Sequence, residues 1–306
     1  MNSNTVNLPL PIVGNDGMAS LILPWCALFR EANPEISFDC TLEGSSTAIM
    51  ALAADASWLA PMSRAPWPHE LAAFERVKGY RPTEIHVGYT GHGPRPEAKS
   101  PPAIYVHRDN PLAGLTMAQL ASVFSSGQSC GDITNWQQLG LEGKWHKRRI
   151  HLYGLRDNGK YATAFRYAHL AGRHYPAHYE GLADRRAVIE AVAQDPFGAG
   201  CLGWCNAALF SDDVRILPLA SEANTAFYSP DLVNVAQGNY PLSSYVSLCF
   251  DLPPGATLDP LVKAWLEMTL SDEGQTIVAD QTHSPEGYVP LEPSMLAYQR
   301  QRLANL

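Results

Sequence analysis

The sequence predicts an α/β protein of two lobes, each a mainly parallel sheet flanked by helices, with a ligand crevice between the lobes. Short apolar strands alternate with helices along most of the chain, a pattern typical of parallel sheets covered on both faces. A stretch rich in Pro and Gly at residues 91–102 interrupts the alternation and indicates a loop between two units. The length of 306 residues suffices for about two domains, each with its own core.

The first ninety residues show the alternation most clearly. Residues 35–42 alternate apolar and polar side chains in period two, which indicates a strand, and Asn33-Pro34 ends the helix before it. The polar turn Gly44–Thr47 caps the next helix, and Pro68 stands in the first turn of another. The predicted elements are a strand ending near residue 13, helix 18–31, strand 35–42, helix 48–54, strand 58–62, helix 68–76 and strand 83–87.

A second unit of the same kind follows the loop. Its apolar runs and helical periodicities predict strand 103–107, helix 116–124, strand 150–154, helix 159–170, helix 185–193, strands near Gly200 and Val214, strand 240–250 and helix 261–280. Two α/β lobes of this type usually bind a ligand in the crevice between them.

Charge and hydropathy exclude several classes of partner. Lys and Arg number 22 against 30 Asp and Glu, a net charge of −8, which argues against nucleic acid or an anionic membrane surface. The longest apolar stretch, residues 18–29, is broken by Ser20 and Pro24, so no membrane-spanning segment is predicted. Residues 1–6 lack the basic and apolar regions of a signal peptide, which leaves a cytosolic chain or a leader replaced by a starting methionine.

The six cysteines match no zinc-binding pattern and are too few for a disulfide scaffold. Their even number weakly favours an oxidising compartment. Cys26, on the first helix, and Cys40, on the following strand, can meet, and so can Cys201 and Cys205. Buried free thiols are an equally good interpretation of each pair.

Catalytic motifs are missing from the sequence. It contains no nucleophile elbow, zinc-protease helix, P-loop or dinucleotide fingerprint, and its ten histidines are dispersed. Nothing pairs a nucleophile with a base. We therefore predict no enzyme activity, no catalytic residue, no metal and no cofactor.

Three polar turns at predicted helix N-termini suit an oxyanion instead: Asn15–Gly17, Gly44–Thr47 and Asp157–Lys160. Helix N-termini present unpaired N–H groups and a positive dipole end, although a plain helix cap is the commoner role of each turn taken singly. Arg64 follows an apolar strand, where a guanidinium can grip two oxygens of a tetrahedral anion; a surface ion pair is the alternative. Arg156 and Lys160 can add charge near the third turn.

The sequence resembles the PstS-like periplasmic phosphate-binding proteins, the substrate-binding components of ABC transporters. The resemblance covers almost the whole chain in order. The stretches that carry it are Gly44–Thr47, Ala60–Arg64, Glu70–Glu75, Tyr105–Pro111, Leu115–Ser125, Gly131–Trp136, Ile150–Gly154, Ser271–Gln275 and Gly287–Leu291.

This resemblance implies a type II periplasmic binding fold, with lobe 1 formed by residues 1–88 and 248–306 and lobe 2 by residues 89–247. It further implies a periplasmic, monomeric protein that closes over phosphate or another small oxyanion and serves an ABC permease. Carried over by position, the ligand-binding groups fall on Asn15, Asp16, Gly17, Met18, Ser45, Ser46, Thr47, Ser63, Arg64, Arg156, Asp157, Gly159, Lys160 and Tyr161.

Two of these turns depart from the family pattern. The first usually reads Gly-Ser-x-Thr and is here Gly14–Gly17, which removes two hydroxyl donors; the last usually carries Arg and then Ser-Gly-Thr and here ends Gly159-Lys160-Tyr161. A dehydrated anion needs nearly all its donors, at about 1.5–3 kcal/mol for each charge-assisted bond. Phosphate is the first expectation, and the alternative is a PstS-like protein that binds a different, organic anion or acts as a sensor without transport.

Overall fold

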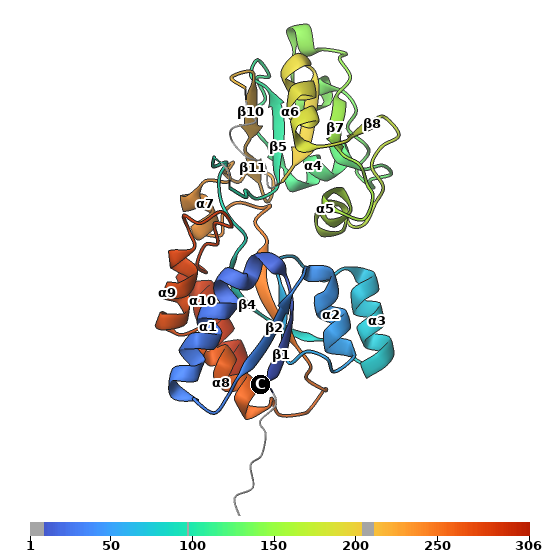
Figure 1. The fold of residues 1–306 in the computed structure, drawn as a ribbon. Coiled ribbons are helices and arrows are strands. Elements are labelled where there is room, and N and C mark those ends of the chain that lie inside the picture. The colour runs from blue at the N-terminus through green and yellow to red at the C-terminus, as the bar shows by residue number, and fades with distance from the viewer. Residues whose placement is uncertain (1–8, 97, 204–210) are drawn as a thin grey trace, which may run out of the picture. The chain divides into compact units, whose positions relative to one another are not determined.

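The computed structural model describes residues 9–96, 98–203 and 211–306. Its contacts divide the chain into two compact units: unit 1 holds Met1–Thr90 and Ser244–Leu306, and unit 2 holds Gly91–Ser243 (Figure 1). The chain therefore leaves unit 1 once and returns to it once. The interpretations placed on residues 1–6 and on Cys205 lie outside the described residues.

Among the described residues of unit 1 there are five strands, and of these β12 alone runs against the others. β1 pairs in parallel with β2, and a parallel bridge between Ile12 and Leu59 joins β1 to the segment of β3. β12 lies antiparallel between β3 and β4, which gives the order β2-β1-β3-β12-β4. The bounds of β1 to β4 and β12 are Leu10–Gly14, Phe38–Leu42, Ala60–Met62, Thr83–Tyr89 and Tyr245–Phe250.

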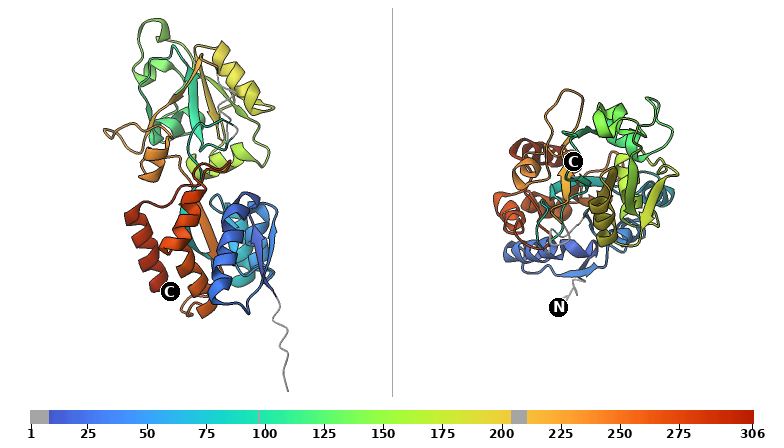
Figure 2. Two further views of the ribbon diagram at one scale, coloured as in Figure 1. Left: turned by 60° about the vertical axis from the view of Figure 1, so that its left-hand side comes forward. Right: turned by 90° about the horizontal axis from the view of Figure 1, so that it is seen from above.

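Helices cover both faces of these strands because neighbouring strand residues point to opposite sides. Leu248 of β12 belongs to the larger core cluster, with Trp25 and Trp265, and Cys249 belongs to the smaller one, with Phe74. α2 and α3 lie together over the smaller cluster (Figure 1), and the C-terminal helices α8, α9 and α10 lie together with α1 over the larger one (Figure 2). These helices span Ala19–Ala32 (α1), Ser45–Ala53 (α2), Pro68–Lys78 (α3), Pro260–Thr269 (α8), Asp272–Asp280 (α9) and Pro293–Ala304 (α10).

Unit 2 is built on a five-stranded sheet in the order β8-β7-β9-β5-β10. β7 pairs in parallel with β8 and β9, and β5 is antiparallel to both of its neighbours. The bounds are Ala103–His107 (β5), His151–Leu155 (β7), Tyr179–Leu182 (β8), Gly198–Leu202 (β9) and Val214–Leu217 (β10). A small parallel pair, β6 and β11, spans Leu115–Thr116 and Leu219–Ala220; the helices are Met117–Phe124 (α4), Tyr161–His169 (α5), Arg185–Gln194 (α6) and Leu232–Ala236 (α7).

The two units share one topology. In each, the earliest of the mutually parallel strands, β1 or β7, lies between the next two, and one reversed strand, β12 or β5, is inserted before the last parallel strand. Ligands of such sheets bind beyond the carboxyl ends of the strands, where the strand order switches direction. The topology therefore points to the turns after β1 and β3 in unit 1 and to the turn after β7 in unit 2.

Most predicted elements are present, and the differences have local causes. The helix predicted over 261–280 is two helices, because the Ser271 hydroxyl accepts a hydrogen bond from the Gly274 N–H at 3.1 Å and starts α9 anew. The strand predicted over 240–250 begins only at Tyr245, since the Tyr240 hydroxyl instead donates to the Pro102 carbonyl at 2.7 Å. The elements β6, β8, β11, α7 and α10 were not predicted from the sequence. None of the helices in the described part of the chain is long and apolar enough to cross a membrane.

Candidate functional site

Three segments of unit 1 meet beyond the carboxyl ends of β1 and β3, and we call them the unit 1 half-site: Asn15–Met18, Ser45–Thr47 and Ser63–Arg64. The Asn15 N–H donates to the Pro61 carbonyl at 3.0 Å, and the Gly44 N–H donates to the Gly14 carbonyl at 2.9 Å. Gly14 permits this approach, because a Cβ there would lie 2.6 Å from the Pro61 oxygen. The backbone thus draws together segments that are far apart in the sequence.

Asn15 holds the first turn in place and joins it to the second. Its side-chain oxygen accepts a hydrogen bond from the Met18 N–H at 3.2 Å, which caps the 3-10 turn Asp16–Met18. Its Nδ2 donates to the Ser45 hydroxyl at 3.0 Å and to the Asp16 carboxylate at 3.3 Å. Met18 is fully buried, whereas Asp16 is exposed. Asn15 therefore serves both as a cap and as an amide donor.

The N-terminus of α2 supplies backbone donors. Gly44, with φ 138°, lets the chain turn sharply into the helix, and the N–H groups of Ser45 and Ser46 have no acceptor within the helix. Ser45 is buried and Ser46 is exposed. The Thr47 hydroxyl donates its proton to the Gly44 carbonyl at 2.8 Å, and a ligand contact of Thr47 stays a prediction.

Arg64 is held by Glu70 through two parallel hydrogen bonds. Nη1 donates to Oε2 at 2.8 Å, and Nη2 donates to Oε1 at 2.6 Å. The carboxylate is 3% exposed and also accepts from the Trp67 N–H at 2.6 Å. The Trp67 ring lies 4.2 Å from the guanidinium carbon. Glu70 thus caps α3 and orients Arg64 at the same time.

This pairing leaves one edge of the guanidinium available. Nη1 donates its second proton to the Ala65 carbonyl at 3.0 Å. In the part of the chain that the structure describes, no acceptor is found for the Nε–H of Arg64 or for the second proton of Nη2. These two groups point the same way from one edge of the planar group and suit two oxygens of one oxyanion.

Two carboxylates lie beside the first turn. A Cβ on Gly17 would lie 2.8 Å from Oε2 of Glu286, so this carboxylate lies close to the backbone of the first turn. The charges of Glu286 and Asp16, together with burial as the larger cause, raise the pKa of Tyr288. The half-site therefore combines donors with carboxylate acceptors.

The turn after β7 in unit 2 is organised around Asp157. Its carboxylate accepts the hydroxyl proton of Thr163 and pairs with Nε of Arg166 at 2.9 Å. The Thr163 hydroxyl accepts from the Gly159 N–H at 2.8 Å, and Gly159 has φ 81°, which glycine adopts without strain. Asp157 and the Gly159 N–H therefore shape the loop, and their contact with a ligand stays a prediction.

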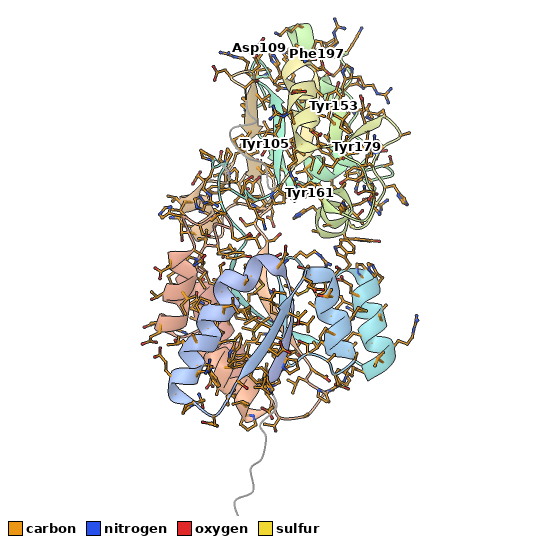
Figure 3. The ribbon with its side chains drawn as sticks, in the orientation of Figure 1. Tyr105, Asp109, Tyr153, Tyr161, Tyr179 and Phe197 are labelled. Atoms are coloured by element: carbon orange, nitrogen blue, oxygen red, sulfur yellow. The ribbon has the colours of Figure 1, made fainter. Side chains whose placement is uncertain are left out.

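The cations of this loop face outward. Arg156 and Lys160 are exposed, and neither pairs with a carboxylate among the described residues. The Tyr161 ring lies inside unit 2 (Figure 3), 6% exposed, with its hydroxyl 3.9 Å from Sγ of Cys201. Burial raises the pKa of Tyr161 well above its usual value. The Tyr161 ring thus packs in the core, and its place among the ligand-binding residues stays a prediction.

Sequence reasoning missed two residues of the site. Glu70 had a usable signal, since a glutamate two residues after Pro68 is typical of the first turn of a helix. Glu286 had none, because only the fold brings it to Gly17. Across residues 9–96, 98–203 and 211–306, no group of three or more His, Cys, Asp or Glu side chains is arranged to hold a metal ion.

Known proteins similar to this chain share its architecture. The model of the PBP superfamily domain matches residues 3–273. The phosphate-binding protein PstS of Pseudomonas aeruginosa is 32% identical over 286 residues, which cover 92% of this chain and 83% of that protein.

Solved structures agree on the fold. PstS from Borrelia burgdorferi superposes with a TM-score of 0.60 at 16% identity, over 92% of this chain and 98% of that one. An ABC-type phosphate transport receptor from Vibrio cholerae superposes with a TM-score of 0.56 at 17% identity, over 92% and 99%. The chain therefore belongs to the PBP superfamily and, within it, to the family of the phosphate-binding protein PstS.

Proposed function

We propose that this chain is a solute-binding protein for inorganic phosphate or a closely related small oxyanion. The single observation that carries the proposal is the Arg64–Glu70 pair, which offers the Nε and Nη2 edge of the guanidinium next to the N-terminus of α2. The name of the Pseudomonas aeruginosa relative, phosphate-binding protein PstS, supports the same ligand.

The carboxylates of Asp16 and Glu286 favour phosphate over sulfate. At neutral pH phosphate carries at least one proton, which a carboxylate can accept as a hydrogen bond, whereas sulfate carries none and is repelled. Glu286 lies against Gly17 in the first turn. The proposal therefore includes discrimination between two tetrahedral anions of similar size.

Delivery of the anion to an ABC permease, a periplasmic location and a monomeric state, which the family resemblance implies, are part of the same proposal. A catalytic role is not proposed, since no described group pairs a nucleophile with a base in the half-site. Arg156 and Lys160 are proposed as further cationic groups for the same anion, because both are exposed beside the helix start of α5.

Isothermal titration of the full chain tests the proposal, with phosphate, sulfate and glycerol phosphate compared at neutral pH. We expect saturable binding of one phosphate, with sulfate at least tenfold weaker. No heat of binding up to millimolar phosphate would overturn the proposal, and tighter binding of glycerol phosphate would shift it to an organic anion. Bound phosphate should also raise the melting temperature, because it stabilises only the folded state.

A further inference from the structure

A pair of thiols lies in the core of unit 1, away from the half-site. Cys26 of α1 belongs to the larger core cluster, and Cys40 of β2 packs against that cluster. Both thiols are free, and they lie close enough for each to shift the pKa of the other. The other described cysteines lie elsewhere: Cys130 contacts the Ser122 hydroxyl, Cys201 contacts the Tyr161 hydroxyl, and Cys249 belongs to the smaller cluster.

The register of α1 against β2 explains why these two cysteines meet. The rings of Phe29 and Phe38 pack edge to face, with centroids 6.2 Å apart. Cys26 precedes Phe29 by almost one helical turn on the same face, and Cys40 follows Phe38 by two residues on the same side of the strand. Cys26 and Cys40 are therefore displaced from the Phe29–Phe38 contact in the same direction and by similar lengths, so they lie opposite each other. The contact is a consequence of the fold.

Burial and the interaction between the two thiols assign different roles to the two sulfurs. Cys26 is 6% exposed, and Cys40 is half-buried. The interaction between the two thiols lowers the pKa of the Cys40 thiol and raises that of Cys26. Cys40 is thus the more accessible sulfur and the one that more readily forms the thiolate that attacks a disulfide.

We propose that Cys26 and Cys40 form an intramolecular disulfide that links α1 to β2. The oxidant is a small-molecule or protein disulfide. Its S–S bond is attacked by the Cys40 thiolate, which forms a mixed disulfide and releases one thiol. Cys26 then loses its proton and attacks Sγ of Cys40, the mixed disulfide breaks, and the second thiol leaves. Two protein thiols are oxidised, and one external disulfide is reduced to two thiols.

The link joins the two elements that carry the first turns of the unit 1 half-site. α1 follows Asn15–Met18 directly, and β2 leads into Gly44 and Ser45. A covalent bond between them restricts the relative movement of these turns. It also closes a loop of roughly 15 residues, which stabilises the chain mainly by limiting its unfolded state.

The test treats the full chain with oxidised glutathione, digests it without reduction and maps disulfide-linked peptides by mass spectrometry. We expect a Cys26–Cys40 peptide pair, the protection of these two thiols from alkylation, and a melting temperature that rises by roughly 5–10 °C and returns with dithiothreitol. Cys130→Ala is the matched control and should form the same link. Cys26→Ala should leave Cys40 as a stable mixed disulfide with glutathione.

The mapping of the unmodified chain needs no variant, so a folding defect of Cys26→Ala cannot obscure it. Oxidation that leaves both cysteines alkylatable, or that joins either of them to Cys130, would overturn the proposal. Its outcome is independent of phosphate titration, because the link is detected chemically.

Discussion

Glu70 accepts hydrogen bonds from both terminal nitrogens of the Arg64 guanidinium, with N–O distances of 2.8 and 2.6 Å. No described residue accepts a hydrogen bond from the Nε edge of this guanidinium. An arginine held in this way is pre-oriented for a planar, two-oxygen contact at little further cost in side-chain entropy. The positive charge of Arg64 is also balanced by the negative charge of Glu70. The unit 1 half-site therefore recognises an anion by the direction of its hydrogen-bond donors more than by net charge.

Arg64→Ala should weaken phosphate binding at least tenfold, or about 1.4 kcal/mol, because a charge-assisted bidentate contact is lost. Arg64→Gln combined with Glu70→Gln should weaken it similarly without leaving a buried carboxylate unpaired. Titration calorimetry measures both. Arg81→Ala is the control, since Arg81 forms only an exposed pair with Glu75 at 3.6 Å. Affinity that is unchanged in the double variant would show that Arg64 has only a structural role.

Glu70→Ala should lower the free energy of unfolding by about 3 kcal/mol. The buried carboxylate holds Arg64 and caps α3, and removing one partner of a largely buried pair is strongly destabilising. Urea denaturation measures the change. Glu75→Ala, on the same helix but exposed, should alter stability by less than about 0.5 kcal/mol. Equal effects of the two substitutions would contradict the importance of the Arg64–Glu70 pair.

Asn15→Asp should reduce phosphate affinity by roughly a hundredfold while the protein stays folded. The carboxylate can still cap the turn through the Met18 N–H, but it removes the Nδ2 donor and brings a negative charge to the anion. Asn33→Asp, at the other end of α1, is the control and should leave affinity unchanged. Calorimetry gives affinity, and circular dichroism confirms the fold.

Arg156→Gln combined with Lys160→Gln should weaken phosphate binding by about three- to tenfold, more at low than at high salt, because exposed charges are screened. Arg186→Gln, an exposed cation on α6, is the control. Titrations of both variants with phosphate at two ionic strengths measure the loss of affinity and its dependence on salt. An effect no larger than that of Arg186→Gln would place the ligand contacts in unit 1 alone.

His169 should make unit 2 less stable in mild acid. Burial lowers the pKa of His169 to about 4, so between that value and the ordinary pKa near 6.5 the unfolded chain binds a proton that the folded chain does not. Stability therefore falls as the pH drops through this window, by no more than about 3 kcal/mol. His169→Leu should flatten this part of the pH profile of melting temperature, whereas exposed His146→Gln should not.

Local patterns in the sequence predict most helices and strands and part of the unit 1 half-site. Alternation and caps identify α2 and the strand before Arg64, because burial and helix capping act over a few residues. The break at Ser271 was missed, since a serine can either cap a helix or continue within one. The inward ring of Tyr161 was missed because the direction of a side chain at a helix start depends on what packs behind it.

The sequence by itself determined the α/β class, the family and the polar turns with Arg64, all of which depend on short-range periodicity or on motifs. Only the tertiary structure decided that Asn15 binds Ser45, that Glu286 lies against Gly17 and that Cys26 meets Cys40. Such pairs are set by the packing of elements that lie far apart in the sequence or that no local sequence pattern connects. Their hydrogen bonds and close contacts exist only after the core has brought the backbones together.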